Sequence, residues 1–471
     1  MENKKEQRET IAAIATGLTD SGIGIIRISG ENAIPVADKI FRSVKGKRIL
    51  EHSESHLMHY GYIVENSEEN WQDSIIDEAM VVVFRNPKSF TGEDVAEIQC
   101  HGGVLVMNKI LQAVLENGAR LAEPGEFTKR AFLNGRIDLT RAEAVMDLIH
   151  SQNEYALSSS VSQLRGKLSD EIKTLRNDII YEIAFIESAL DDPEHISLEG
   201  YTEKLDQKLY QLISQVRKLL ATADSGKLIK EGIKTVIVGK PNAGKSSLMN
   251  LLVGEDRAIV TEIAGTTRDV LCENVRLKNI GLQLVDTAGI HDTFDKVEKI
   301  GVERAKKYAK DADLILYVVD TSVPLDDNDR EILSIIEDKK LVVLLNKSDL
   351  ISVVDEEAIK KFFNRDIEIV KTSAQNGEGL EELEERIRKM FFGGELQMNH
   401  EIVITNLRHK EALQEAYDSL LLTKKSVEAE MPEDFYSIDL MSAYASLGKI
   451  IGEQVEDDLV EEIFSKFCMG K

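Results

Sequence analysis

The spacing of apolar positions changes along the chain, and the first part predicts a mixed domain. Short apolar runs such as Ile23–Ile28, Met80–Phe84 and Val95–Ile98 are separated by Gly, Asn and Pro, a pattern typical of strands. Between them lie stretches with helical spacing, such as Val104–Asn117. We therefore predict an N-terminal α+β domain over residues 1–121.

Two later segments share a helical pattern. Apolar residues recur every three or four positions in residues 122–223, for example at Ile172, Leu175 and Ile179, and the same texture returns in residues 379–471. The intervening residues 224–378 differ, so the simplest prediction is one helical domain interrupted by an insert. Separate domains that follow one another along the chain are the alternative.

The insert has the pattern of buried parallel strands. Near-continuous apolar runs, such as Leu282–Val285, Leu314–Val319 and Leu341–Leu345, each end in polar loop residues. Helical stretches separate these runs. We therefore predict a parallel sheet flanked by helices.

Composition narrows the class of protein. The chain has 471 residues, of which 42% are hydrophobic and 30% charged, which excludes a collagen-like or wholly disordered chain. Its 83 acidic and 58 basic residues give a net charge of -25, so contact with nucleic acid should be local or shared with a partner. No apolar targeting or membrane-spanning segment is evident, so we expect a cytoplasmic protein without a membrane partner. The cysteines Cys100, Cys272 and Cys468 show no zinc-site or disulfide spacing.

A phosphate-binding loop is the strongest motif. Gly239 to Ser246 reads GKPNAGKS, between the predicted strand Thr235–Val238 and a predicted helix over Ser247–Leu252. Backbone N–H groups of such a loop surround phosphates at a helix N-terminus. Lys245 would bridge the β- and γ-phosphates, and the Ser246 hydroxyl would ligate magnesium.

Further motifs follow in the order typical of GTP-binding domains. Asp349 in the NKSD segment can accept two hydrogen bonds from guanine, whereas adenine would leave its carboxylate unpaired, so we predict GTP as the nucleotide. Asp286 would face the metal, Gly289 the γ-phosphate, and Thr267 both. The predicted nucleotide-binding residues are Asn242, Ala243, Gly244, Lys245, Ser246, Ser247, Thr261, Glu262, Ile263, Ala264, Gly265, Thr266, Thr267, Asp286, Thr287, Ala288, Gly289, Asn346, Lys347, Ser348, Asp349, Ser373 and Ala374.

Two positions indicate an unusual hydrolysis mechanism. Ile290 follows the DTAG segment where small signalling GTPases carry a glutamine, and an isoleucine cannot orient a water molecule. Asn242 could hold a monovalent cation against the phosphates and supply the charge of an arginine finger. The alternative is that Asn242 only shapes the loop.

Taken together, the motifs resemble the tRNA-modification GTPase MnmE (TrmE) family over nearly the whole chain. The resemblance is carried by GIGIIRISG at Gly22–Gly30, SFTGEDVAEIQCHGG at Ser89–Gly103, the segment Pro124–Ile149, the GTPase motifs, and the ending Phe467–Lys471. It implies an N-terminal folate-binding-like and dimerisation domain, and a helical domain with an inserted P-loop GTPase domain.

The resemblance also implies an activity and its partners. It implies a potassium-stimulated GTPase that forms a homodimer and a heterotetramer with the FAD-containing protein MnmG. Together they would add an aminomethyl or carboxymethylaminomethyl group to carbon 5 of the wobble uridine (position 34) of certain tRNAs. The one-carbon unit would come from (6S)-5-formyl- or 5,10-methylene-tetrahydrofolate.

Residue roles follow from the same resemblance. Arg27, Glu97, Arg136 and Lys471 would contact the folate. Potassium would be held by Asn242, Thr261, Ile263 and Thr266, and magnesium by Ser246 and Thr267. Glu298 would orient the attacking water, with Lys245 and Gly289 completing the catalytic set.

Several residues keep an alternative interpretation. Arg27 could be an edge-strand charge that faces solvent, and Glu97 could simply face water. Cys468 is a candidate nucleophile if a histidine such as His101 lies near, but packing or a mobile terminus would also explain it. The basic residues Arg120, Lys129, Arg130, Arg136 and Arg141 form either a solvated face or part of a tRNA footprint.

A second function also stays open. A regulatory GTPase in ribosome assembly would carry the same nucleotide motifs, because those motifs report only the nucleotide and the switch. A folate-binding N-terminal domain favours the modification enzyme, whereas an appended RNA-binding module would favour the rival.

Overall fold

A computed structural model describes residues 9–65, 70–255, 272–285, 310–336, 339–363, 367–392, 402–453, 457–468 and 470. The chain divides into two compact units. Met1–Met146 and Gly448–Lys471 form the first, and Asp147–Leu447 form the second. Among the described helices, none combines the length and apolar character needed to cross a bilayer.

The first unit is built on a mixed sheet. Its described strands form a seven-stranded sheet in the order β3-β4-β5-β6-β2-β1-β7, in which only the β1–β7 pair is parallel. The strands are β1 (Ile11–Ile14), β2 (Ser21–Ser29), β3 (Phe41–Ser43), β4 (Met58–Val64), β5 (Ile75–Phe84), β6 (Val95–Gly102) and β7 (Arg120–Leu121). A short 3-10 helix, Trp71–Ser74, precedes β5.

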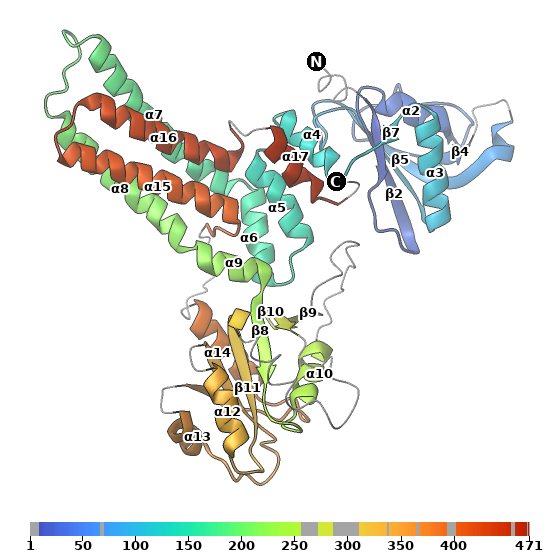
Figure 1. Ribbon diagram of the computed structural model, residues 1–471. Coiled ribbons are helices and arrows are strands. Elements are labelled where there is room, and N and C mark those ends of the chain that lie inside the picture. The colour runs from blue at the N-terminus through green and yellow to red at the C-terminus, as the bar shows by residue number, and fades with distance from the viewer. Residues whose placement is uncertain are drawn as a thin grey trace. The chain divides into compact units, whose positions relative to one another are not determined.

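Two helices cover one face of this sheet. α2 (Ala33–Ile40) and α3 (Val104–Glu116) pack on it, as Figure 1 shows. Ile26 and Ile28 of β2 and Ile98 of β6 are buried in the core beneath the helices. Because side chains alternate along a strand, Arg27 and Glu97 lie on the opposite face. This division confirms the predicted α+β character.

The remaining helices of the first unit form a small core of their own. They are α4 (Glu126–Leu133), the first part of α5 (Leu139–Ile149) and α17 (Asp457–Ser465). Leu139 and Met146 of α5 pack against Val460 and Phe464 of α17. The C-terminal segment therefore belongs to the same unit as the N-terminal sheet.

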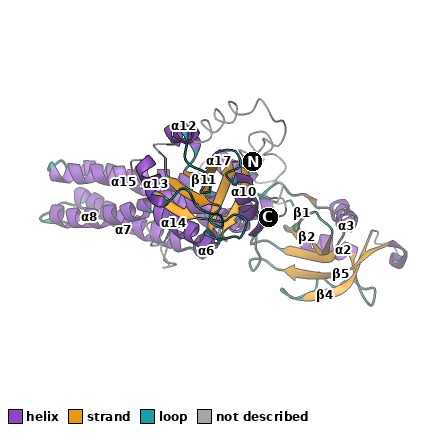
Figure 2. Cartoon of the chain, turned by 90° about the horizontal axis from the view of Figure 1, so that it is seen from below, coloured by secondary structure: helices purple, strands orange, loops and turns teal. Residues whose placement is uncertain are grey.

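The second unit contains long helices from both sides of the insert. They are α6 (Glu154–Leu164), α7 (Lys167–Asp191), α8 (Tyr201–Ala221), α9 (Ala223–Glu231), α15 (Leu407–Glu428) and most of α16 (Glu433–Ile451). α8 and α15 lie side by side although the GTPase-like segment separates them in the chain (Figures 1 and 2). The prediction of an interrupted helical domain is confirmed.

The insert folds as a sheet between two helical layers. Its described strands form a six-stranded sheet in the order β13-β12-β11-β8-β10-β9, parallel except for β9. The strands are β8 (Ile233–Val238), β9 (Cys272–Leu277), β10 (Ile280–Val285), β11 (Leu314–Asp320), β12 (Leu341–Asn346) and β13 (Glu368–Lys371).

Helices from four positions complete the layers. Apolar side chains of α10 (Lys245–Glu255) and α14 (Leu380–Phe392) share one core with the sheet, and those of α12 (Asp327–Ile336) and α13 (Glu356–Phe363) share another. α14 thus packs on the sheet, although it lies beyond residue 378. The domain bounds at residues 121, 223 and 378 stay predictions.

Candidate functional site

The phosphate-binding loop joins β8 to α10 at the carboxyl ends of the parallel strands. Gly239 has a φ of 153°, and a Cβ there would lie 2.4 Å from the carbonyl oxygen of Val318 on the adjacent strand. Gly244 has a φ of 99°, and a Cβ there would lie 2.1 Å from Asn346 Nδ2. Only glycine fits both positions, so the sequence pattern corresponds to a steric requirement.

Lys245 is folded into the loop. Its Nζ donates to the carbonyl oxygens of Gly239 at 2.8 Å and Lys240 at 2.7 Å. Burial lowers the pKa of this lysine, because a charged ammonium loses hydration there. Among the described residues no carboxylate pairs with Lys245, so a phosphate would supply its negative partner, which is the chemistry expected of this position.

The residues predicted to recognise guanine lie together. Asn346 Nδ2 donates to the Ala243 carbonyl at 2.8 Å, and Asn346 Oδ1 accepts from the Ala374 N–H at 3.1 Å. Ser373 Oγ donates to Asp349 Oδ1 at 2.7 Å. The structure therefore brings the NKSD segment, the Ser373–Ala374 segment and the phosphate loop to one place.

A neighbouring ion pair supports this arrangement. Lys347 Nζ lies 2.5 Å from Asp320 Oδ2 at the end of β11. Burial opposes ionisation of Asp320, but hydrogen bonds from Lys347 and Ser322 outweigh it and lower the pKa of this carboxyl group. The Thr321 hydroxyl donates to the Asn346 carbonyl at 3.0 Å. This bond ties the residue after β11 to the start of the NKSD segment.

The cation sites are described only in part. Ser246 lies exposed in the first turn of α10, and Asn242 is exposed with a φ of 62°. Ser247, the next residue of the same helix, is also exposed. The following predicted nucleotide, metal and catalytic positions lie outside the described residues: Thr261, Glu262, Ile263, Ala264, Gly265, Thr266, Thr267, Asp286, Thr287, Ala288, Gly289 and Glu298. Their roles stay predictions.

In the first unit, two of the predicted folate residues form an ion pair. Arg27 and Glu97 face each other across β2 and β6, with Arg27 Nε 2.8 Å from Glu97 Oε1. Both side chains are only 18% exposed, so neither is a simple solvated charge. The Arg27 guanidinium also donates to the Gly470 carbonyl at 3.3 Å, which brings the C-terminal segment to this pair. Lys471 itself lies outside the described residues.

Two aromatic rings lie close to the Arg27 guanidinium. Its guanidinium carbon lies 5.6 Å from the centre of the Phe90 ring and 5.7 Å from that of Phe127. Phe127 belongs to α4 and is fully buried. Sequence reasoning included Phe90 and Phe127 within motifs but did not assign them a role, because only the fold places them against Arg27.

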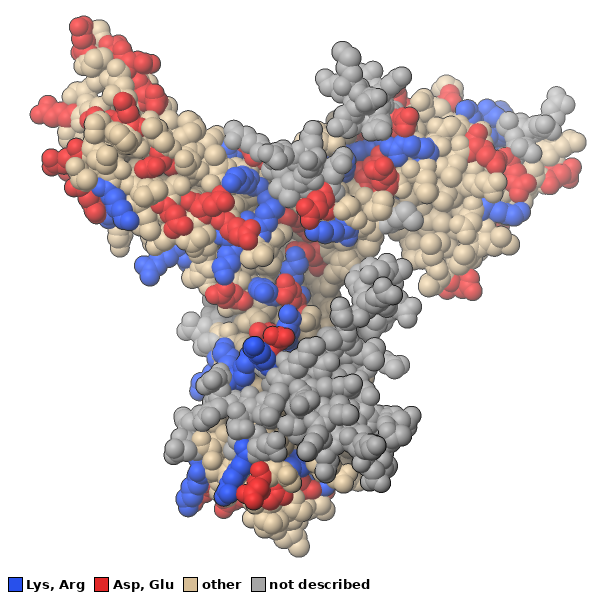
Figure 3. All heavy atoms as spheres, viewed as in Figure 1, with Lys and Arg blue, Asp and Glu red and all other residues tan. Residues whose placement is uncertain are grey.

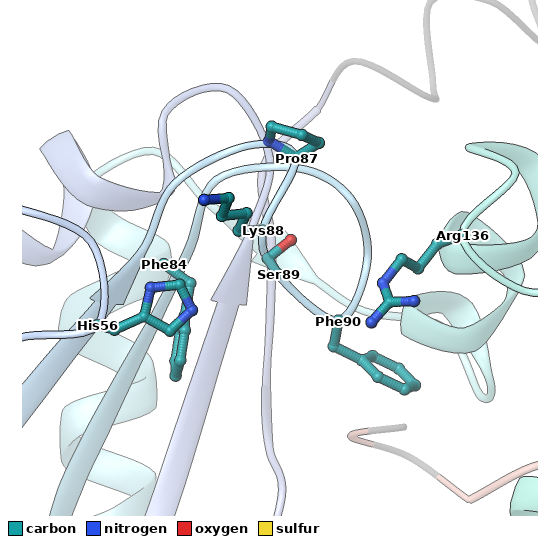
Figure 4. A pocket seen from close by; sticks show the side chains of 7 residues that line it. All are labelled: His56, Phe84, Pro87, Lys88, Ser89, Phe90 and Arg136. Carbon is teal, nitrogen blue, oxygen red and sulfur yellow. The ribbon is translucent and has the colours of Figure 1, made fainter. Parts of the chain in front are cut away.

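Arg136 lines a cavity together with Phe90. The cavity has a volume of about 500 Å³, and its lining also includes His56, Phe84, Pro87, Lys88 and Ser89, as Figure 4 shows. Phe90 is therefore shared between this cavity and the surroundings of Arg27. The structure brings Arg27, Glu97 and Arg136 into one region of the first unit.

Among the described residues, no hydrogen bond joins Cys468 to His101. Its imidazole Nδ1 is 2.7 Å from Asp77 Oδ1, and this contact raises the pKa of His101. Cys468 is exposed, whereas Cys100 is buried and its pKa is raised to about 11 by burial. A role for Cys468 stays a prediction.

Three of the five basic residues near α4, Arg120, Arg130 and Arg141, form ion pairs within the first unit. Arg130 is buried and pairs with Glu126 and Glu93, at 2.9 and 3.1 Å. Arg120 pairs with Glu126 at 2.6 Å, and these hydrogen bonds outweigh burial to lower the pKa of Glu126. The prediction of a solvated face was wrong for Arg130, because Glu126 on the same helix and Glu93 from a distant segment both pair with it.

Comparisons with known proteins cover nearly the whole chain. A family model described as the MnmE helical domain matches residues 139–468, and one described as the GTP-binding protein TrmE N-terminus matches residues 10–136. The tRNA modification GTPase MnmE of Lachnoclostridium phytofermentans is 57% identical over 463 residues, 98% of this chain and 99% of that protein. The corresponding protein of Clostridioides difficile is 49% identical over 467 residues, with the same coverage of each chain. The chain therefore belongs to the tRNA modification GTPase MnmE family.

Proposed function

We propose that this GTPase of tRNA modification is stimulated by potassium and acts with the FAD-containing protein MnmG. Together they would add an aminomethyl or carboxymethylaminomethyl group to carbon 5 of the wobble uridine, with the one-carbon unit of a tetrahydrofolate. Family membership supports GTP hydrolysis in tRNA modification. The observation that supports the folate part is the Arg27–Glu97 pair beside Phe90 and Phe127.

The residues at this pair suit a folate. A pterin ring is flat and carries adjacent N–H donors, which a carboxylate such as Glu97 can accept. Aromatic side chains offer flat apolar contacts, and Arg27 holds the Glu97 carboxylate in place at 2.8 Å. A bound folate would supply the one-carbon unit. Arg136 would add positive charge for its anionic end, and Lys471 is the fourth proposed contact.

Residues of the second unit would carry GTP hydrolysis. Lys245 would exchange its two carbonyl partners for phosphate oxygens, and Asp349 would accept from guanine. Ser246 and Thr267 would hold magnesium, and Asn242, Thr261, Ile263 and Thr266 would hold potassium. Glu298 would orient the attacking water, a task that Ile290 cannot perform.

Self-association and partner binding complete the proposal. Exposed apolar side chains on β4 and β5 support a homodimer through the N-terminal domain: Met58 and Tyr60 are each 51% exposed, and Met80 is 41% exposed. The homodimer would join MnmG in a heterotetramer. A regulatory role in ribosome assembly is less well supported, because the matched N-terminal and helical families are those of a modification GTPase.

Calorimetry on the full chain tests the folate part. Titration with (6S)-5-formyl-tetrahydrofolate should release heat, and Glu97→Ala should weaken binding by about 1.5 to 3 kcal/mol, the range for hydrogen bonds to charged groups. Glu78→Ala is the matched control, since Glu78 is an exposed carboxylate on the adjacent strand β5. If wild-type protein binds no folate at millimolar concentration, this part of the proposal is wrong.

The coupling of hydrolysis to modification has its own test. Glu298→Ala should leave GTP affinity nearly unchanged and slow hydrolysis at least about tenfold, or about 1.4 kcal/mol of barrier. The same variant should lose wobble-uridine modification in cells, because a switch that does not reset completes no cycle. Full modification by this variant would show that hydrolysis is not required.

A further inference from the structure

Two positive side chains line the cavity in Figure 4 and form no ion pair in the part of the chain that the structure describes. Within the residues that the structure describes, neither the Lys88 ammonium nor the Arg136 guanidinium takes part in an ion pair or a side-chain hydrogen bond. Nearby Arg120 and Arg130, in contrast, are paired with carboxylates at 2.6 to 3.1 Å. In a chain with a net charge of -25, two unpaired cations at one cavity indicate an anionic ligand.

The cavity has a supported wall. Ser89 is buried, and its hydroxyl donates to the Glu93 carbonyl at 2.6 Å. Asn134 Nδ2 donates to the Thr91 carbonyl at 2.8 Å, which ties the loop to the end of α4. The Arg136 N–H donates to the Ala131 carbonyl at 2.8 Å in the turn that ends this helix. These hydrogen bonds therefore fix the position of the loop that contains Ser89 and Thr91 relative to the end of α4 and Arg136.

The opposite wall is apolar with a polar edge. The His56 ring meets the Phe84 ring edge-on, with centres 5.3 Å apart, and His56 Nδ1 lies 2.8 Å from the Ser55 hydroxyl. The cavity of about 500 Å³ falls within the range of about 300–1,000 Å³ typical of small-molecule sites. Its chemistry suits a flexible chain with carboxylates, since Lys88 and Arg136 supply charge while the Phe84 and Phe90 rings supply apolar contact.

The cavity adjoins the proposed folate site. Phe90 contributes to the cavity lining, and the same ring lies 5.6 Å from the Arg27 guanidinium carbon. α4 also connects both places, because Phe127 near its start lies against Arg27 and Arg136 follows its end. An elongated ligand with a ring at Glu97 could therefore extend past Phe90 into the cavity.

We propose that the cavity between Lys88 and Arg136 binds the glutamate tail of the folate and makes the site prefer folates with several γ-linked glutamates. This inference rests on the folate site of the proposed function. Arg136 can bind a carboxylate through two parallel hydrogen bonds, whereas Lys88 acts as a point charge. Each added glutamate brings one more carboxylate, so a longer tail engages both cations while a single glutamate engages fewer.

Calorimetry of the full chain with two folates tests this preference. Wild-type protein should bind the triglutamate of 5-formyl-tetrahydrofolate about three- to tenfold more tightly than the monoglutamate, because exposed ion pairs are individually weak. High salt should reduce the difference, since it screens exposed charges. Lys88→Met should reduce the preference, and Lys88→Met with Arg136→Met should abolish it. Lys45→Met, at an exposed lysine outside the cavity lining, should retain it.

The outcomes separate this inference from the proposed function. Equal affinity of wild-type protein for both folates would overturn the tail site and leave the Arg27–Glu97 site standing. A length preference that survives in the double variant would also overturn it. If wild-type protein binds neither folate, the proposed folate function fails and the tail site fails with it. Arg136→Lys should keep part of the preference, because it retains the charge and loses the paired geometry.

Discussion

A buried carboxylate beneath the phosphate-binding loop offers the sharpest prediction on stability. Asp329 of α12 is 1% exposed. It accepts hydrogen bonds from the Tyr317 hydroxyl at 2.5 Å, the Lys240 ammonium at 2.8 Å and the Asp326 N–H at 2.8 Å. Lys240 belongs to the phosphate loop, so this network ties the loop to β11 and α12. We predict that Lys240→Met strongly destabilises this part of the protein.

The expected magnitude follows from burial. Lys240→Met leaves the Asp329 carboxylate buried without a counter-charge, which costs about 3–5 kcal/mol for pairs of this kind. Tyr317→Phe removes one hydrogen bond to a charged acceptor and should cost about 1.5–3 kcal/mol. Asp326 cannot replace Asp329 as the main partner, because its side chain is 51% exposed and water screens its charge.

The pH dependence has a definite sign. Burial alone would lower the pKa of Lys240, but the hydrogen bonds that its ammonium donates to Asp329 and Asp326 outweigh burial and leave the pKa raised. A raised pKa means that the folded state binds this proton more tightly than the unfolded state. The contribution of Lys240 is therefore fully present at neutral pH and is lost only as the pH rises through the raised pKa.

Hydrogen exchange measured by mass spectrometry can show which segments are destabilised. A single melting temperature cannot, because the chain has several domains. Peptides from β11 and α12 should exchange faster in Lys240→Met than in Tyr317→Phe. Arg330→Met is the control, because Arg330 on the same helix pairs with Asp327 while both side chains are largely exposed. If Lys240→Met exchanges no faster than this control, the reasoning about the buried charge is refuted.

Three further outcomes are expected. Asp349→Asn should weaken GTP binding by at least about 2 kcal/mol in nucleotide titrations, and equal affinity of wild-type protein for ATP and GTP would rule out its guanine role. GTP hydrolysis should be faster in potassium than in sodium at matched ionic strength, with Asn242→Ala removing the difference; identical turnover in both salts would count against a potassium site. Alkylation with mass mapping should label exposed Cys468 at mildly alkaline pH and spare Cys100 until the pH nears its pKa of about 11. Because the folded state holds the Cys100 proton more tightly, the free energy of unfolding should decrease as the pH rises from the pKa of the unfolded thiol to about 11. Rapid labelling of Cys100 in folded protein would contradict its burial.

The sequence alone determined the features that depend on local spacing. The loop from Gly239 to Ser246 needs glycine where the backbone approaches a neighbouring strand or side chain. The glycines lie close together in the sequence, so the motif can be identified from the sequence alone. Periodicity likewise predicted a helix over Val104–Asn117, which the structure shows at Val104–Glu116. Such features can be predicted because they depend on interactions between residues close together in the chain. β4 was not predicted, because exposed Met58 and Tyr60 alternate with polar and glycine positions and obscure its buried face.

Only the tertiary structure decided which distant side chains meet. Arg27 and Glu97 could each have faced solvent, and the register of β2 against β6 makes them partners. The five basic residues near α4 looked alike in the sequence, yet carboxylates enclose Arg130 while Arg136 lines a cavity. The physical reason is that strand register and helix packing are set by the whole core, so the surroundings of a charged side chain depend on segments far away in the chain.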